Sequence, residues 1–213
     1  MKFVFETCKS VLQVFESLPT EEIQHMRRVG LLVGLFTQQL ANAKFFDSHS
    51  EAYKLFGEAA TYHDIGKAWV PKEILIKPGR LTDQERQIMC EHPKFSIHLF
   101  NRVEDNYLTG ISGQTLLLAR DCALYHHEWW NGDGYPYKKA YNQIPLIARI
   151  AAICDSYDAM TSNRVYRVAH SHDFACRELK RCAGTQFQPG LILQFLLSRI
   201  SLADVTHLKT VGF

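Results

Sequence analysis

Apolar residues recur at intervals of three and four along most of the chain, and short polar, glycine- or proline-containing stretches separate these segments. The longest segment runs from Thr20 to about Ala43, and its apolar positions include Met26, Val29, Leu32, Val33, Phe36 and Leu40. Side chains at this spacing share one face of an α-helix, and we find no alternation of the kind that half-buried strands show. The pattern therefore predicts an all-α protein, a bundle of about seven to nine helices.

Local signals place the ends of several helices. Thr20 is the expected N-cap of the long helix, since acidic residues follow it. Thr82 and Glu85 have the spacing of a capping box, and Pro93 is expected to interrupt the helix that carries His92. Further helices are expected before Leu18, over Glu51 to Tyr62, Leu116 to Trp130 and Ile144 to Met160, and as a pair between Ser171 and about Ser201.

Composition limits the class of protein. The 213 residues are 46% hydrophobic, which is enough for one substantial core. With 24 basic and 22 acidic residues the net charge is only +2, so duplex nucleic acid is not an expected partner. The six cysteines form no CxxC pair and lie mostly in apolar helical patterns, which indicates reduced core thiols in a cytoplasmic protein. No run approaches the roughly 18 apolar residues of a membrane span, so no membrane partner is expected.

Histidines and carboxylates stand at positions suited to metal binding. Glu21 and His25 are four residues apart and project from one helix face. Asp155 lies in the most uniformly apolar helix, where a charge usually needs a partner or a metal. The candidate ligands come from five helical segments and are Glu21, His25, His63, Asp64, His92, His126, His127 and Asp155.

The composition of this set bears on the metal. Histidine and carboxylate ligands without cysteine favour iron, manganese or zinc over calcium. So many ligands suit two or three ions, with Asp64 bridging two of them through its two oxygens. A water between ions roughly 3.5 to 4 Å apart would supply hydroxide for in-line attack on phosphorus. Each residue also has an ordinary alternative: Glu21 can simply stabilise its helix dipole, which would leave two ions.

Several short motifs closely resemble those of a known family in order and spacing. They are His63-Asp64-Ile-Gly-Lys67, Pro71 to Thr82, His92, His126-His127-Glu128, Gly134-Tyr135-Pro136, Ile144-Pro145, Ala148-Arg149-Ile150 and Asp155 to Arg167. From about Glu21 to Pro189 the chain resembles the HD-GYP phosphodiesterases, α-helical members of the HD superfamily that hydrolyse cyclic di-GMP to pGpG and often onward to GMP. The resemblance implies an N-terminal helix (1–19), an HD-GYP catalytic domain (20–200) with a metal centre in a cleft, and a C-terminal tail (201–213).

The resemblance also implies a ligand set and its metals. Six histidine and aspartate positions match family ligands: His63, Asp64, His92, His126, His127 and Asp155. His25 matches a ligand histidine on an upstream helix, and Glu21 stands where members with a third metal place a glutamate. Two or three divalent ions are expected, iron or manganese, with zinc, nickel, cobalt and magnesium as alternatives.

Roles in catalysis and substrate binding follow from the same resemblance. Lys67 resembles the lysine that meets the scissile phosphate, so Asp64 and Lys67 are the expected catalytic residues. Arg164 and Arg167 resemble the positions that hold the substrate phosphates through forked guanidinium donors. Tyr135 is expected to hydrogen-bond or stack on the dinucleotide. Apart from the resemblance, Asp158 lies one helical turn after Asp155 and is expected to orient Lys67 or a ligand histidine, and a simple buried salt bridge is the alternative.

Two departures from the family pattern bear on specificity. A Gly-Leu-x-Gly stretch commonly follows the tyrosine and proline of the signature turn, whereas this chain has Tyr137-Lys-Lys-Ala-Tyr141, which leaves the nucleotide preference open. Gln188 replaces the usual aspartate and is expected to change a helix cap. We find no receiver, GAF or PAS segment before the matching region and expect regulation through expression, metal state, oligomerisation, for example a homodimer, or a separate partner.

Two alternatives to cyclic di-GMP hydrolysis stay open. One is an HD phosphohydrolase that acts on another cyclic dinucleotide, such as cyclic GMP-AMP, or on a mononucleotide. The other is a cyclic di-GMP sensor that keeps the fold and does not turn over. The complete ligand set argues against the sensor, because degenerate sensors usually lack ligands.

Overall fold

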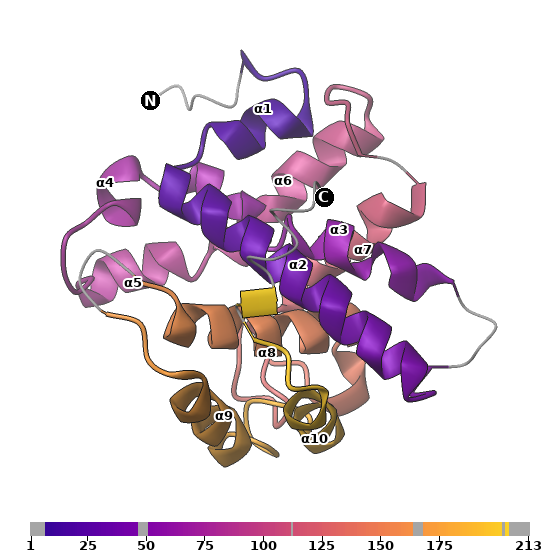
Figure 1. Ribbon diagram of the computed structural model, residues 1–213. Helices are drawn as coiled ribbons and strands as arrows, with labels where there is room; N and C mark the ends of the chain where they lie inside the picture. Colours follow the sequence, from indigo (N-terminus) through magenta and orange to yellow (C-terminus); the bar gives the residue numbers. More distant parts are fainter. Residues whose placement is uncertain (1–6, 47–50, 112, 164–167, 202, 205–213) are drawn as a thin grey trace.

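Helices make up nearly all the regular structure in the computed structural model, which describes residues 7–46, 51–111, 113–163, 168–201 and 203–204 (Figure 1). The α-helices are α1 (Val11–Glu16), α2 (Thr20–Asn42), α3 (Phe56–Ala60), α4 (Lys72–Leu75), α5 (Asp83–Met89), α6 (His92–Glu104), α7 (Gly113–Tyr125), α8 (Leu146–Thr161), α9 (His172–Arg181) and α10 (Pro189–Ser198). Between these helices, in the described ranges, lie the 3₁₀ segments η2 (Ala52–Leu55), η3 (Ile65–Trp69) and η4 (Tyr141–Gln143).

The predicted fold class is confirmed. Across the described ranges the β-type pairing consists of two isolated bridges, and none of it forms a strand. α3 and α4 have only five and four residues, and the other eight α-helices have six or more, which agrees with the expected seven to nine.

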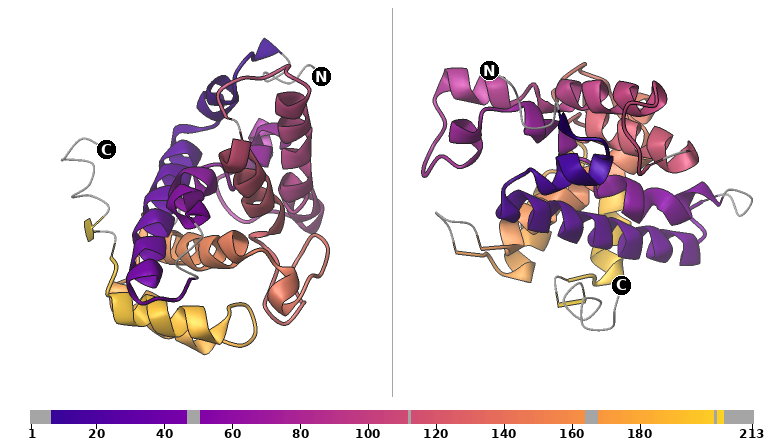
Figure 2. Two further views of the ribbon diagram at one scale, coloured as in Figure 1. Left: turned by 90° about the vertical axis from the view of Figure 1, so that its right-hand side faces the viewer. Right: turned by 90° about the horizontal axis from the view of Figure 1, so that it is seen from above.

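The long helix α2 is the axis of the bundle. It contacts α3 and α8 along its length, while α7 packs against α3, α6 and α8 on the far side of α3 (Figures 1 and 2). α9 and α10 lie beyond α8. The six apolar positions that predicted the helix are all buried, with at most 1% exposure: Met26, Val29, Leu32, Val33, Phe36 and Leu40.

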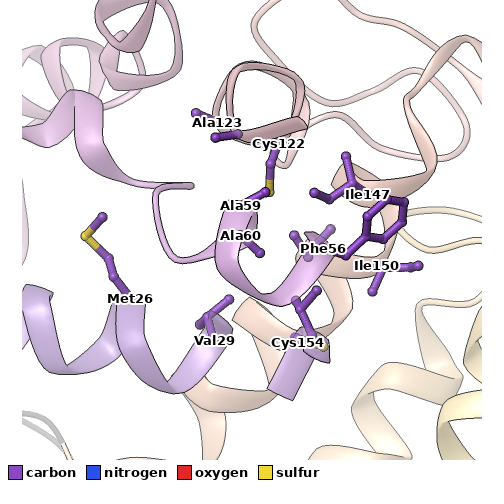
Figure 3. Close-up of a cluster of buried hydrophobic side chains, with 14 of the residues drawn as sticks. Met26, Val29, Phe56, Ala59, Ala60, Cys122, Ala123, Ile147, Ile150 and Cys154 are labelled. Atoms are coloured by element: carbon purple, nitrogen blue, oxygen red, sulfur yellow. The ribbon is translucent and has the colours of Figure 1, made fainter. Parts of the chain in front are cut away.

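Small side chains bring the helices around α3 close together (Figure 3). Ala59 and Ala60 of α3 meet side chains of α2, α7 and α8, and both alanines are fully buried. At Gly57, a Cβ would lie 3.0 Å from the backbone oxygen of Gly30 in α2. α3 therefore packs directly on α2, and the residues that follow α3 lie beside the buried face of α2.

Helix ends agree with the sequence signals in part. Thr82 and Glu85 form the predicted capping box, and α5 and α6 are separate helices with Pro93 in the first turn of α6. The N-cap prediction for Thr20 is wrong, because Pro19 holds that position and Thr20 already has helical geometry. The predicted helix over Leu116 to Trp130 is also too long: α7 ends at Tyr125, and the chain turns there because the backbone of the 134–139 loop packs against residues 127–129.

Other predictions concern single side chains. Gln188 is the N-cap residue of α10 but makes no side-chain cap, and its Oε1 instead accepts a hydrogen bond of 2.8 Å from Arg149 Nη1. All six cysteines are free thiols, and Cys122 and Cys154 are the two that are fully buried. Within the described residues, no helix combines the length and the apolar character that crossing a bilayer requires.

Candidate metal centre

Ends of helical elements bring the candidate ligands together. His63 and Asp64 follow α3, His92 begins α6, and His126 and His127 follow α7. Gly66 explains how closely these ends approach, since a Cβ there would lie 1.9 Å from the backbone oxygen of His92. Only glycine allows η3 to lie against the first turn of α6.

Asp64 is shared by two groups of side chains that could each hold a metal ion. One group is Asp64, His92, His126 and His127, and the other is His25, His63 and Asp64. Oδ1 of Asp64 lies 3.0 Å from His92 Nε2 and 3.5 Å from His126 Nε2. Oδ2 lies 3.3 Å from His63 Nε2 and 3.7 Å from His25 Nε2. The two oxygens thus face different groups, which is the arrangement of a bridging carboxylate.

Backbone carbonyls fix the tautomer of three of these histidines. Nδ1 of His63 lies 2.9 Å from the Ala60 oxygen, Nδ1 of His92 lies 2.7 Å from the Met89 oxygen, and Nδ1 of His126 lies 3.1 Å from the Cys122 oxygen. Because a carbonyl can only accept, Nδ1 carries the proton in each ring and Nε2 presents its lone pair.

The Nε2 atoms that face Asp64 lack hydrogen-bond partners. Among the described residues, four buried atoms of this site have no hydrogen-bond partner, although the nitrogens lie near the carboxylate: Nε2 of His63, His92 and His126, and Oδ1 of Asp64. Buried polar atoms are rarely left unpaired, since each costs about 1–3 kcal/mol. Lone pairs of nitrogen and oxygen that converge without donors are suited to a divalent cation, so these residues fit one.

His25 joins the centre to a buried carboxylate behind it. Its Nδ1 lies 2.7 Å from Oδ2 of Asp158, and its Nε2 lies 3.1 Å from Oδ1 of Asp155. Burial lowers the pKa of His25, but the hydrogen bonds to Asp155 and Asp158 outweigh it and raise the pKa to about 9. Asp155 is thus in contact with the second group, although it is not a member of either group.

Asp158 lies behind His25 and not beside Lys67. It is fully buried, and Arg28 donates to both of its oxygens, from Nε at 2.6 Å and from Nη2 at 2.9 Å. Burial raises the pKa of Asp158, but its partners His25 and Arg28 lower the pKa by a larger amount. The carboxylate therefore stays ionised. Of the two roles considered for Asp158, the geometry favours orientation of a ligand histidine.

Lys67 lies between two carboxylates at the edge of the centre. Its Nζ is 2.7 Å from Oδ2 of Asp64 and 2.7 Å from Oε2 of Glu22. Burial lowers the pKa of Lys67, and the charges of Asp64 and Glu22 reverse this and raise it. The side chains of Lys67, Glu22 and Asp155 are 14%, 21% and 19% exposed, against at most 7% for the histidines that contact Asp64, so they form the open side.

Glu21, the candidate third-metal ligand, is exposed and belongs to neither group. Its neighbour Glu22 points toward the centre instead. The two predicted arginines, Arg164 and Arg167, lie outside the described residues.

The signature turn packs against the candidate ligand His127. The ring of Tyr135 stacks on that of His127 with centroids 4.7 Å apart, and the Tyr135 N–H donates to the His127 oxygen. A Cβ at Gly134 would lie 2.2 Å from the Trp129 nitrogen, so glycine is required there. Burial and the neighbouring His126 and His92 hold the pKa of His127 well below its usual value, which keeps its imidazole neutral and able to bind a metal.

Glu128 anchors the loop that follows the turn. Its carboxylate is buried and accepts the backbone N–H groups of Tyr137 at 2.7 Å and Lys139 at 3.0 Å. Sequence reasoning assigned no role to Glu128, Arg28 or Glu22. The positions of two of them in the sequence could have suggested a role: Arg28 is one helical turn after His25, and Glu128 directly follows the histidine pair.

Comparisons with known proteins agree with this architecture. A model of the HD domain family matches residues 21–191. A cyclic di-GMP phosphodiesterase of Vibrio cholerae is 35% identical over 94% of this chain and 41% of its own length. A 3'3'-cGAMP-specific phosphodiesterase of the same organism is 31% identical over 93% of this chain and 37% of its own length. The chain thus spans less than half of these curated relatives.

A solved structure shares the fold. An HDG"Y"P protein of Bdellovibrio bacteriovorus superposes with a TM-score of 0.57, over 91% of this chain and 57% of that one, at 16% identity. The curated relatives confirm the resemblance to the HD-GYP phosphodiesterases, and the family model spans most of the chain. The chain belongs to the HD-domain family.

Proposed function

We propose that this protein is a metal-dependent phosphodiesterase that hydrolyses cyclic di-GMP to pGpG, with further hydrolysis to GMP left open. One observation carries the proposal: unpaired, buried ligand atoms of three histidines converge on Asp64, and Lys67 lies beside them on the open side. The phosphodiesterase relatives support the reaction class.

Each group around the centre has a distinct task in this proposal. His25, His63, Asp64, His92, His126 and His127 would hold two divalent ions, with Asp155 contributing beside His25. When bound, such ions lower the pKa of a coordinated water and polarise a phosphoryl oxygen. Iron or manganese, a cytoplasmic location and a homodimer stay predictions, and metal analysis decides between two ions and a third ion at Glu21.

Lys67 contributes positive charge where the phosphodiester would lie. Its ammonium stays protonated because Asp64 and Glu22 raise its pKa, so it can stabilise the developing negative charge and act with water to protonate the leaving oxygen. Glu22 holds the ammonium at the open side, and Asp158 with Arg28 holds the ring of His25. Arg164 and Arg167 are proposed to hold the substrate phosphates.

Cyclic GMP-AMP is the second candidate substrate, because one relative is specific for it. The loop beside the signature turn carries Lys138 and Lys139 in this chain, and it offers no feature that selects guanine over adenine. Cyclic di-GMP is put first because a relative named as a cyclic di-GMP phosphodiesterase is 35% identical to this chain, against 31% for the cyclic GMP-AMP-specific relative.

The decisive experiment is anaerobic turnover of cyclic di-GMP by protein loaded with iron or manganese, with metal content measured on the same sample. We expect about two ions per chain and the product pGpG, and the same assay shows whether hydrolysis continues to GMP. Parallel assays with cyclic GMP-AMP and cyclic di-AMP rank the substrates.

Asp64→Ala is the variant that tests the mechanism. It removes the carboxylate common to both groups, so hydrolysis should be lost while the helical circular dichroism is retained. Undiminished turnover in this variant would refute the mechanism, and a metal-loaded protein that binds cyclic di-GMP without cleaving it would establish a sensor.

A further inference from the structure

A separate cavity lies between the end of α7 and the loop after the signature turn. Its volume is about 470 Å³, and its lining residues are Tyr125, Tyr137, Lys138, Lys139 and Gln143. Small-molecule sites in proteins commonly measure roughly 300–1,000 Å³. None of the lining residues belongs to either candidate metal group, so this cavity is distinct from the metal centre.

The wall formed by the loop is held in place by backbone hydrogen bonds. Glu128 binds the N–H groups of Tyr137 and Lys139, and Gln143 Oε1 accepts the Ala140 N–H at 3.2 Å. The Tyr141 N–H donates to the Trp130 oxygen at 2.9 Å. The shape of the cavity is therefore largely formed before any ligand binds.

The lining combines aromatic rings with positive charge. The rings of Tyr125 and Tyr137 lie with centroids 5.9 Å apart, and Nζ of Lys139 is 5.2 Å from the Tyr125 centroid. In the part of the chain that the structure describes, no carboxylate lies within ion-pair distance of Lys138 or Lys139. Asp121 is the nearby acid: burial raises the pKa of its carboxyl, and the charges of Arg120 and Lys139 lower it by less.

Lys138 stands where glycine would be favoured. Its φ is 55°, in the left-handed region, and the side chain is exposed. A lysine at a strained position of a fixed loop adds a cation to the cavity that a glycine would not supply.

We propose that this cavity binds a nucleotide, with the base against the tyrosine rings and the phosphate at Lys138 and Lys139. Phosphate alone would use only the two ammonium groups, and a neutral base alone would use only the rings. A nucleotide uses both, and base stacking on aromatic side chains with phosphate contact to lysine is the common chemistry of nucleotide sites. The site does not rest on the proposed hydrolysis.

The test is calorimetric titration of the chelator-treated, metal-free protein with GMP. We expect saturable binding that is tighter than that of guanosine or of inorganic phosphate. Lys138→Gly should weaken GMP binding at least about fivefold, because it removes one charged contact while glycine accepts the same backbone conformation. Titration with cyclic di-GMP then shows whether the intact dinucleotide or its mononucleotide product is the better ligand.

Lys44→Gly is the matched control. Lys44 also has a left-handed φ, 54°, and lies after α2 away from the cavity lining, so GMP affinity should not change. Lys67→Gln separates the two sites, because GMP bound in the cavity should bind as before, whereas GMP held at the metal centre would bind more weakly. The inference is overturned if GMP does not bind, if phosphate binds as tightly as GMP, or if Lys67→Gln weakens binding more than Lys138→Gly does.

Discussion

Oε2 of Glu22 lies 2.7 Å from Nζ of Lys67, although 45 residues separate them in sequence. The adjacent Glu21 is exposed. The pair of glutamates therefore offers a matched comparison at the start of α2.

Glu22→Gln should lower turnover about tenfold with metal content unchanged, because Lys67 loses one of the two charges that hold it at the open side. Glu21→Gln should change neither quantity. The measurement is steady-state hydrolysis with metal analysis of both variants. A loss of about one ion per chain in Glu21→Gln would instead establish Glu21 as the ligand of a third metal.

Gly66→Ala should destabilise the protein and displace His92. The added Cβ would meet the His92 oxygen at 1.9 Å and the Ser96 nitrogen at 2.7 Å, and both are backbone atoms that cannot swing away. We expect a loss of about 3 kcal/mol in the free energy of urea unfolding and reduced metal content. Gly190→Ala in α10 is the control, since a Cβ there has nothing within 4 Å, and it should be neutral or stabilising. Equal stability of the two variants would contradict this account.

Glu128→Gln should loosen the loop and leave the metal ligands in place. One amide oxygen can accept only one of the two backbone N–H groups well, while the amide NH₂ faces the other. We expect a loss of about 1–3 kcal/mol in unfolding free energy, unchanged metal content and weaker GMP binding. The exposed Glu73 provides the control Glu73→Gln, which should match the unaltered protein in all three measurements. A variant of Glu128 that keeps full stability would refute the anchoring role.

The metal-free protein should lose stability as the pH rises from about 6.5 through 9. His25 has its pKa raised from 6.5 to about 9 on folding, so its protonated form stabilises the fold below pH 6.5 and this contribution disappears above the folded pKa. The shift corresponds to about 3 kcal/mol. Urea unfolding of chelator-treated protein at pH 6.5 and 9.5 measures it. His25→Gln should show a smaller change between the two pH values, and an identical change would exclude His25 as the origin.

The sequence predicted the helices and most of the clustered candidate ligands because both depend on local signals. Apolar spacing determines which face of α2 is buried, and His63, Asp64, His126 and His127 are paired along the chain. Local signals could not show which of the two glutamates, Glu21 or Glu22, faces the metal centre. Both lie in the first turn of α2, and which of them faces the centre depends on how the helix is rotated when its apolar face packs on α3 and α8.

Contacts between residues far apart in the sequence could not be predicted either. Arg28 contacts Asp158 across 130 residues, and Glu22 contacts Lys67 from another helix. Neither contact can be predicted from the spacing of the two residues in the sequence. The end of α7 was misplaced for a related reason: the apolar pattern continues past Tyr125, but the packing of Gly134 against residues 127–129 turns the chain.

Glu128 holds the loop through main-chain N–H groups, which every residue except proline possesses. Side chains at 137–139 can therefore be exchanged during evolution without releasing the loop or disturbing the histidines beside it. In this chain the ligand preference of the cavity could therefore be altered by substitutions at 137–139 while the buried histidines and Asp64 keep their positions.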